Sequence, residues 1–215
     1  MEFRDVVRAR RMVRAYDRTR PVPTATLTRL LELAIRAPSA GFSQGWDFVV
    51  LRTPADTGRF WAATRDGDGE PDRWLAGMQS APVLVLCLSD RERYLDRYAE
   101  PDKGWSDRDS GRWPVPYWDV DTGMAGLLML LGAVDEGLAG CFFGVPPERR
   151  AAVLAEFGAP ADRRIVGVIS LGHPAPAADR RSPSLRRGRR PLTEVAHDGD
   201  FGTSWDPARS QPAPD

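Results

Sequence analysis

Two clusters of arginines carry the most distinctive chemistry of this chain. The first is Arg8, Arg10, Arg11 and Arg14, four arginines within seven residues, and the second is Arg186-Arg187-Gly188-Arg189-Arg190. A planar guanidinium binds two oxygens of a phosphate at once, so each cluster would form an anion site. The alternatives are a solvated basic helix end, stabilised by the helix dipole, for the first cluster and a solvated basic tail for the second.

A loop of small residues lies between the two clusters. Ala37–Leu51 reads APSAGFSQGWDFVVL, in which Pro38 stops a helix and an apolar strand follows. From Ser39 to Gln44 the residues are small, flexible or hydrogen-bonding, apart from Phe42. Such a loop lays backbone amides and hydroxyls against a flat ligand while an aromatic ring covers one face. A polar helix-to-strand turn is the alternative.

Length and charge bound the class of protein. The chain has 215 residues and a formal net charge of zero, which favours one large or two small globular domains and argues against a nucleic-acid or membrane-surface binder. The N-terminus is charged from Glu2 and shows no secretory signal, and the longest apolar stretch, Met124–Val134, is too short to span a bilayer. Cys87 and Cys141 lie in apolar runs without metal-ligand spacing, so we expect buried thiols in a reducing cytoplasm and no metal site.

Hydrophobic periodicity and breakers predict the elements that position these residues. Helices are expected at Glu2–Met12, with Phe3, Val6 and Val7 as its apolar face, at Ala25–Arg36 after an N-cap at Thr24, at Pro54–Thr64, from a cap at Asp119 or Asp121 to about Glu136, and at Pro147–Phe157. Strands are expected at Trp46–Arg52, Pro82–Leu88 and Ile165–Leu171, and a short strand or turn at Cys141–Gly144, after Gly137 and Gly140 break the preceding helix.

Two further regions suggest contacts with a second subunit or with a ligand. Gly123–Val134 is apolar on nearly all sides, which indicates a buried helix, part of it covered by a second subunit. Ser89–Trp118 is polar, without strong periodicity, and carries several tyrosines and tryptophans. Long segments of this kind are often lids or binding loops, the alternative being an irregular surface excursion. The segment after Trp205 is typical of disorder.

Several motifs together resemble the nitroreductase family. RARRMVRAY (Arg8–Tyr16) is similar to its N-terminal arginine motif, and APSAGFSQGWDFVVL to its second motif. A strand ending in Leu171-Gly172-His173-Pro174, a basic segment and the P-L-x-E-V signature at Pro191–Val195 follow in the family's order, so that the resemblance covers about Glu2–His197. It implies an α+β fold with a central, mostly antiparallel sheet flanked by helices in an intertwined homodimer. The expected organisation is a single FMN-binding domain over 1–200 and a flexible tail over 201–215.

The resemblance also implies a site shared between two chains, with FMN at the subunit interface. Cofactor-binding positions carried over from it are Arg10, Arg11, Met12 and Arg14 near the phosphate and pyrimidine edge, Pro38, Ser39, Ala40, Phe42 and Gln44 from the other subunit, Phe143 and Gly144 at the flavin N5 side, and Arg187 and Arg189 at the phosphate, where a slip of one would bring in Arg190. It names no catalytic side chain, because the flavin carries the chemistry.

The implied activity is hydride transfer from NAD(P)H through flavin N5 to a nitroaromatic, quinone or similar planar acceptor. Three departures from the family pattern qualify it: Met12 replaces the usual Ser, Phe42 the usual Asn and Gly45 the usual Pro. A G-F/Y-x-Q loop is similar to the dimethylbenzimidazole synthase branch, which fragments reduced FMN with oxygen. That activity, a flavin-binding protein without turnover, and a deazaflavin in place of FMN are the alternatives.

Overall fold

The computed structural model describes residues 1–65, 70–176 and 187–208, and the chain divides into two compact units, Met1–Asp179 and Arg180–Asp215. The helices of the first unit are α1 (Phe3–Ala9), α2 (Thr24–Ala34), α3 (Pro54–Thr64), α4 (Arg73–Met78), α5 (Arg91–Ala99), α6 (Tyr117–Asp135) and α7 (Arg150–Glu156), with 3₁₀ turns η1 (Ala40–Phe42), η2 (Ser110–Arg112) and η3 (Pro147–Arg149). Its strands are β1 (Trp46–Leu51), β2 (Val83–Ser89), β3 (Ala139–Phe143) and β4 (Arg164–Gly172).

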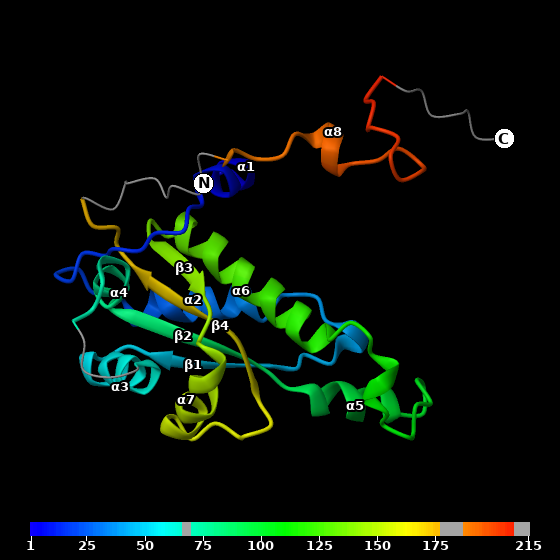
Figure 1. Cartoon of the computed structure of the whole chain (residues 1–215), viewed down its shortest axis with the longest axis horizontal. Coiled ribbons are helices and arrows are strands. Elements are labelled where there is room, and N and C mark those ends of the chain that lie inside the picture. The colour runs from blue at the N-terminus through cyan, green and yellow to red at the C-terminus, as the bar shows by residue number, and fades with distance from the viewer. Residues whose placement is uncertain (66–69, 177–186, 209–215) are drawn as a thin grey trace. The chain divides into compact units, whose positions relative to one another are not determined.

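The strands form one antiparallel sheet in the order β1-β2-β4-β3, with β1 and β3 at its edges (Figure 1). The register pairs Trp46 with Ser89, Val83 with Leu171 and Ala139 with Gly172. All seven residues of β2 are buried, because β2 is a central strand covered on both faces. The predicted α+β fold with an antiparallel sheet flanked by helices is confirmed.

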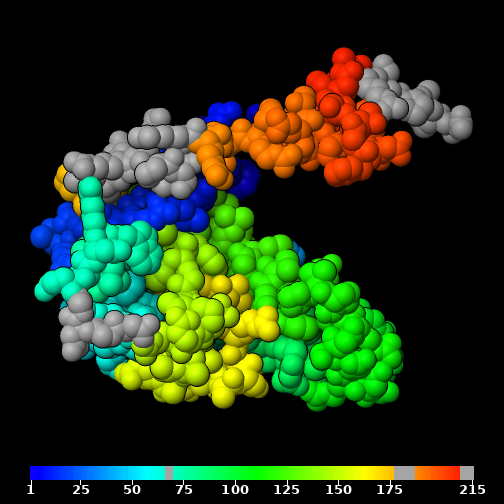
Figure 2. Space-filling view, in the orientation of Figure 1, coloured from blue at the N-terminus to red at the C-terminus, as the bar shows by residue number. Residues whose placement is uncertain are grey.

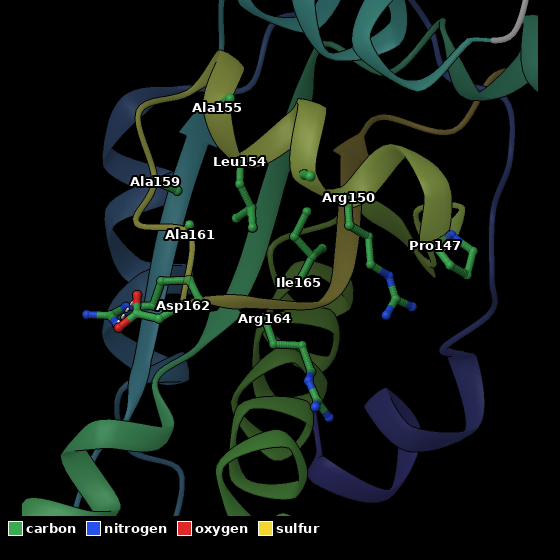
Figure 3. A pocket seen from close by; sticks show the side chains of 11 residues that line it. Pro147, Arg150, Leu154, Ala155, Ala159, Ala161, Asp162, Arg164 and Ile165 are labelled. Carbon is green, nitrogen blue, oxygen red and sulfur yellow. Dashed lines mark hydrogen bonds and ion pairs between the residues drawn. The ribbon is translucent and has the colours of Figure 1, made fainter.

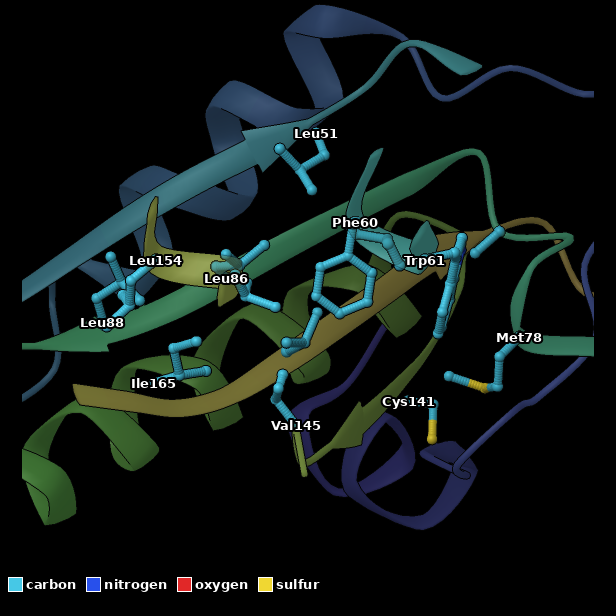
Figure 4. Close-up of a cluster of buried hydrophobic side chains, with 14 of the residues drawn as sticks. Leu51, Phe60, Trp61, Met78, Leu86, Leu88, Cys141, Val145, Leu154 and Ile165 are labelled. Carbon is cyan, nitrogen blue, oxygen red and sulfur yellow. The ribbon is translucent and has the colours of Figure 1, made fainter. Parts of the chain in front are cut away.

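Each face of the sheet buries its own apolar cluster, which follows from the period-2 alternation of strand side chains. On one face, Val83, Val85 and Cys87 of β2 pack with α2 and α6. On the other, Leu84, Leu86 and Leu88 pack with α3 and α7, around the fully buried Phe60 (Figure 4). Burying each such side chain contributes about 1.5–3 kcal/mol, so these two layers supply most of the stability of the first unit.

Local sequence signals explain several boundaries. Helix α3 begins as predicted at Pro54, because Thr53 Oγ1 accepts from the Asp56 amide at 3.1 Å and the Asp56 carboxylate accepts from the Thr53 amide at 3.3 Å. This reciprocal capping box satisfies two otherwise unpaired donors, with proline at the first helical position. Gly137, with φ of 70°, ends α6 in the left-handed region, where glycine is favoured.

Six expectations were wrong in detail. The first helix ends at Ala9 rather than Met12, and only Val6 of its expected apolar face is buried. Pro23, not Thr24, is the N-cap of α2, which stops at Ala34. Helix α6 begins at Tyr117 after Pro116, so Asp119 and Asp121 lie inside the helix instead of capping it. Gly140 belongs to β3 and does not serve as a helix breaker.

The polar segment that follows β2 is ordered and packed. It contains α5, the turn η2 and a cluster of aromatic rings in edge-to-face and tilted contact, namely Tyr94, Tyr98, Trp105, Trp113, Tyr117 and Trp118. The segment that carries them belongs to the green region of Figure 2. We name residues 91–118 the aromatic segment.

The second unit is described over 187–208. It contains the short helix α8 (Leu192–Val195) and an isolated bridge between His197 and Ser204. None of its described residues is buried, and Leu192, Val195, Phe201 and Trp205 are exposed. The predicted domain boundary at residue 200 stays a prediction. Much of the segment expected to be disordered, 209–215, lies outside the described residues.

Candidate functional site

The N-terminal arginine segment lies in extended form along the free edge of β3. The Val13 amide donates to the Gly140 carbonyl at 3.1 Å, and Met12 and Gly140 form a parallel bridge. The Phe142 amide donates to the sulfur of Met12 at 3.4 Å. These bonds replace the last helical turn expected for this stretch, and they bring residues 10–14 beside the end of β3.

Tyr16 fixes the end of this segment. Its hydroxyl lies 2.7 Å from Ser170 Oγ and donates to the Val13 carbonyl, also at 2.7 Å, while its amide donates to Ser80 Oγ at 2.7 Å. Burial raises the pKa of the Tyr16 hydroxyl above its ordinary value, so it stays a neutral donor. Helix α4 also approaches closely: a Cβ on Gly77 would lie 2.2 Å from the Arg14 carbonyl oxygen.

Two guanidinium groups of this segment, those of Arg10 and Arg14, have donors with no partner or a weak one in the part of the chain that the structure describes. Arg10 is half-buried, and its Nη1 has no hydrogen-bond partner among the described residues. Arg14 is also half-buried and uses Nη1 for one long bond, 3.3 Å, to the Met12 carbonyl. Arg11 is exposed. A buried cationic donor without an acceptor is unfavourable by itself, so Arg10 fits a site that an anionic or carbonyl-bearing ligand completes.

At the end of β3, a ligand can reach backbone peptide groups rather than side chains. The Phe143 ring turns into the core, stacked on Trp61 with 10° between planes, and it meets Phe60 and Trp74 edge-on. Gly144 is exposed, and a Cβ added there would meet nothing within 4 Å. The peptide groups of Phe143 and Gly144 are therefore the parts of this turn that a ligand can approach.

The loop Pro38–Gln44 has an unusual backbone. Gly41, Phe42 and Gln44 have φ of 61°, 56° and 50°, in the left-handed region that side chains with a Cβ rarely adopt. Ser39 Oγ accepts from the Gln44 amide at 3.0 Å, and Ser43 Oγ donates to the Ala40 carbonyl at 2.7 Å. Phe42 stands out with 74% of its surface exposed. Strain of this kind persists where the surroundings impose it and is concentrated at functional sites.

Three residues outside the predicted set impose that conformation. Asp121 Oδ2 accepts from the Ala40 amide at 2.9 Å and from the Tyr94 hydroxyl at 2.7 Å, and Arg97 Nε donates to the Gly41 carbonyl at 2.9 Å. The sequence does not reveal this role, because the pattern around Asp119 and Asp121 predicts a helix cap there. The signal in the sequence is a carboxylate in the first turns of a mostly apolar helix.

A single chain does not bring the two halves of the expected site together. The loop Pro38–Gln44 bonds to Asp121 of α6, whereas Gly140, the neighbour of the arginine segment, packs against Leu130 of α6. Nine residues separate these points, about 13 Å along the helix axis. The loop leads into β1 and the arginine segment adjoins β3, the opposite edges of the sheet, which adds three strand spacings of about 4.8 Å each (Figure 1).

The C-terminal basic pair lies in the second unit. Arg187 and Arg189 are exposed there. Arg190 is engaged with Glu194, through Nε to the carboxylate at 3.3 Å and Nη2 to the carbonyl at 2.8 Å. Whether Arg189 or Arg190 joins Arg187 at a phosphate stays a prediction.

A separate pocket of about 520 Å³ lies between α7, the following loop and the start of β4 (Figure 3). Leu154 and Ile165 supply apolar lining, and Arg150 and Arg164 supply guanidinium groups. Arg164 is ion-paired with Asp119 at 2.6 Å. None of the predicted cofactor-binding residues lines this pocket, so it is distinct from the two halves described above.

Solved structures with the same fold are numerous among nitroreductase-type proteins. A nitroreductase-like protein from Streptococcus mutans matches with a TM-score of 0.69 and 14% identity over 93% of this chain and 98% of that chain. A nitroreductase family protein from Clostridium difficile matches with a TM-score of 0.66 and 22% identity over 94% and 99%. A proposed nitroreductase from Exiguobacterium sibiricum, solved in complex with FMN, has a TM-score of 0.68 and 20% identity over 91% and 96%.

The model of the nitroreductase family matches residues 7–173, and the chain belongs to that family. An NADH dehydrogenase of Thermus thermophilus is 37% identical over 95 residues, 43% of this chain and 42% of that protein. The proposed NAD(P)H nitroreductase YodC of Bacillus subtilis is 45% identical over 49 residues, 23% and 24% of the two chains. The matched stretch thus spans less than half of each relative. Within the described residues, no helix combines the length and apolar character that crossing a bilayer requires.

Proposed function

We propose that this protein is a cytoplasmic, FMN-dependent oxidoreductase that passes hydride from NAD(P)H to a nitroaromatic, quinone or similar planar acceptor. The observation that carries the proposal is Arg10, whose Nη1 is buried without a partner among the described residues, beside an exposed backbone turn at the end of β3. A flavin nucleotide has both an anionic phosphate and a carbonyl-rich ring edge, the acceptors that such donors require.

The proposed site assigns separate tasks to separate groups. Arg10, Arg11 and Arg14 hold the phosphate and the pyrimidine edge, and the chain around Met12 lies alongside. The peptide groups of Phe143 and Gly144 face the N5 side of the ring. Bound FMN would supply the redox chemistry, accepting hydride at N5 and returning electrons to the acceptor. The absence of a side chain at Gly144 leaves room for the donor and acceptor to approach to about 3–3.5 Å.

We infer that the second half of the site comes from a second copy of the chain. The loop residues Pro38, Ser39, Ala40, Phe42 and Gln44 lie too far from the arginine segment of their own chain to share a ligand with it. A stripe on α6 supports the homodimer: Val120 and Leu127 are exposed, and Met124 and Leu131 are half-buried. These four positions share one face of the helix, where a second copy would cover them.

Acceptor selection would depend on the space between the bound flavin ring and Phe42 of the second copy. An exposed Phe42 from one copy would lie over the ring bound by the other and would favour flat, mostly apolar acceptors. A nicotinamide ring and a planar acceptor would then use the same space in turn, which gives ping-pong kinetics. The exposed Phe42 also supports the alternative of an oxygen-dependent, flavin-fragmenting synthase, because the synthase-like loop has an aromatic residue at this position.

One set of measurements tests the proposal. The absorption spectrum of the purified protein reports bound FMN, and anaerobic titration with NADH and NADPH reports its reduction. We expect bleaching by one or both nicotinamides, recovery of colour with FMN intact on adding a quinone or nitroaromatic, and parallel double-reciprocal lines. No bleaching by nicotinamides, combined with conversion of chemically reduced FMN to a benzimidazole in oxygen, would establish the synthase instead. A flavin that stays oxidised throughout would identify a binding protein.

A further inference from the structure

The strained loop Pro38–Gln44 is held from outside by a buried carboxylate. Asp121 is 2% exposed, and its Oδ2 accepts from both the Ala40 amide at 2.9 Å and the Tyr94 hydroxyl at 2.7 Å. Since charged acceptors form the stronger hydrogen bonds, this oxygen is a firm attachment point. It joins three elements: the first turns of α6, the loop and α5.

Tyr94 is well suited to share this oxygen. Its ring is buried, and burial together with the Asp121 carboxylate raises the pKa of its hydroxyl, so Tyr94 remains a protonated donor. A Cβ on Gly45 would lie 2.4 Å from the Tyr94 ring and 2.6 Å from the Asp90 carbonyl oxygen. The glycine at position 45, where the family motif usually has proline, is therefore what allows Tyr94 to reach Asp121.

A second contact acts on the next residue of the loop. Arg97 Nε donates to the Gly41 carbonyl at 2.9 Å, and Arg97 is itself held by the Asp102 carboxylate at 2.7 and 2.8 Å. The Tyr98 ring closes over Gly41, where a Cβ would approach it to 2.7 Å. Left-handed conformations at Phe42 and Gln44 persist because these neighbours over-determine the loop.

We infer that Asp121, with Tyr94, is a positioning residue that presets the loop so that Phe42 projects toward the acceptor bound in a second copy. The consequence for acceptor selection rests on the proposed function, whereas the preset loop does not. Tyr94 also packs on Trp113 and Trp118. It therefore connects the aromatic segment to the loop. The residues that choose the acceptor thus include some that never touch it.

The test compares two aspartates of the same helix. Asp121→Ala removes the attachment, whereas the control Asp119→Ala removes bonds of similar strength, to Ser89 Oγ and Arg164, that do not involve the loop. Asp121→Asn is the conservative variant, because a single amide oxygen can accept both bonds that now go to Oδ2. Tyr94→Phe is the milder second variant should Asp121→Ala not fold.

Two readouts separate the inference from the proposed function. Hydrogen exchange of the Ala40–Gln44 amides reports the loop directly, and we expect Asp121→Ala to speed exchange at Ala40 by roughly ten- to a hundredfold. In turnover, KM for a planar acceptor should rise by up to the same factor at unchanged kcat when the enzyme is saturated with FMN, because only the ordered loop is competent. Asp119→Ala should change neither readout, and Asp121→Asn should restore most of both.

Each remaining outcome is decisive. Unchanged loop exchange in both Asp121→Ala and Tyr94→Phe, or the same acceleration in Asp119→Ala, overturns the preset loop. Faster exchange with an unchanged acceptor KM overturns the role in acceptor selection. A wild-type protein without turnover refutes the proposed function and the acceptor role that rests on it, and the exchange comparison still decides whether Asp121 presets the loop.

Discussion

The indole of Trp61 and the ring of Phe143 lie nearly parallel, with 10° between their planes and 5.7 Å between their centroids. Trp61 belongs to α3 and Phe143 ends β3, so the pair ties the turn at Gly144 to the core. The side chain of Phe143 therefore acts in packing, and only its peptide group is left for the proposed cofactor.

Replacing Phe143 by leucine should separate these two roles. We expect Phe143→Leu to lower the free energy of unfolding by about 1–2 kcal/mol, from a modest change of volume and the loss of an aromatic pair. FMN affinity should stay unchanged, because the backbone that faces the ligand is retained. Urea unfolding and fluorescence titration with FMN measure the two quantities. A large loss of FMN affinity with little loss of stability would place the ring itself in the cofactor site.

Arg14 should contribute to affinity and little to folding. Its half-buried side chain makes one long bond within the described residues, and a charge-assisted bond to phosphate is worth about 1.5–3 kcal/mol. Arg14→Ala should therefore weaken FMN binding by roughly ten- to a hundredfold. The matched control is Arg8→Ala, because Arg8 is 78% exposed on α1 and pairs only loosely, at 3.9 Å, with Asp5.

Riboflavin provides an independent check on the same arginines. It lacks the phosphate, so wild-type protein should bind it much more weakly than FMN, and Arg14→Ala should narrow the difference between the two ligands. Equal wild-type affinity for riboflavin and FMN would mean that the arginine segment serves another purpose.

Replacing Arg10 should raise the stability of the cofactor-free protein and lower its affinity for FMN. With its Nη1 buried and unpartnered in the described part of the chain, the cofactor-free protein bears the cost of an unsatisfied donor, about 1–3 kcal/mol. Arg10→Met keeps the apolar stem and removes the donor, so the apoprotein should melt at a higher temperature while FMN affinity falls. Calorimetry of the apoprotein and FMN titration test this, and a lower apoprotein melting temperature would contradict it.

Local sequence patterns predict most of the secondary structure but not the hydrogen bonds that join distant elements. The buried strand near Pro82–Leu88 and the helix Pro54–Thr64 carry strong local signals, an apolar run and a capping box, and both are present. Helix α1 is shorter than its pattern indicates, because residues after Ala9 gain more by pairing with Gly140 of β3 than by continuing the helix. That competition depends on a strand 130 residues away, so no local pattern reveals it.

In the candidate site too, sequence motifs predict individual residues but not the distant residues that hold them. The family motifs identify Arg10, Arg14 and Phe42 by position, yet the left-handed backbone at Phe42 depends on Asp121 and Arg97. Those partners lie 81 and 56 residues from the loop positions they bind. The composition of the aromatic segment predicts a lid or a surface excursion. It does not reveal that the rings pack against one another, because those contacts depend on the three-dimensional structure.

The apolar stripe of α6 gives a direct test of the dimer. Leu127 is 48% exposed in one copy, and a second copy would bury it. Leu127→Glu places a charge in that interface and should dissociate the dimer at micromolar concentration, together with FMN. Ala152→Glu, on the exposed surface of α7, adds the same charge elsewhere and should leave the dimer intact. Light scattering distinguishes the two, and a folded, FMN-loaded wild-type monomer would remove the basis for a shared site.

Because of Cys87, the free energy of unfolding should decrease at alkaline pH. Burial raises the pKa of its thiol from 9.0 to about 12, so above pH 9.0 the unfolded chain loses this proton while the folded chain keeps it. The free energy of unfolding should then fall as pH rises, by up to about 1.4 kcal/mol per pH unit for one proton. Buried Tyr16 and Tyr94, whose pKa values are also raised, add to the loss at higher pH.

The thiol contribution is isolated by Cys87→Ala. This variant should be less stable at neutral pH, because it leaves a small cavity, yet its stability should fall less steeply just above pH 9.0. Urea unfolding at a series of pH values measures both slopes. Parallel curves for wild type and variant would assign the alkaline loss to other groups.

Helix α6 carries the attachments of both half-sites, Asp121 for the loop and Leu130 for the strand beside the arginines. Adding or deleting one residue between them would turn one attachment by about 100° and shift it by about 1.5 Å relative to the other. The number of residues in this helix is thus constrained more tightly than their identity. Among homologous chains, insertions and deletions should gather in surface connections such as the one between α7 and β4 and be absent from the middle of α6.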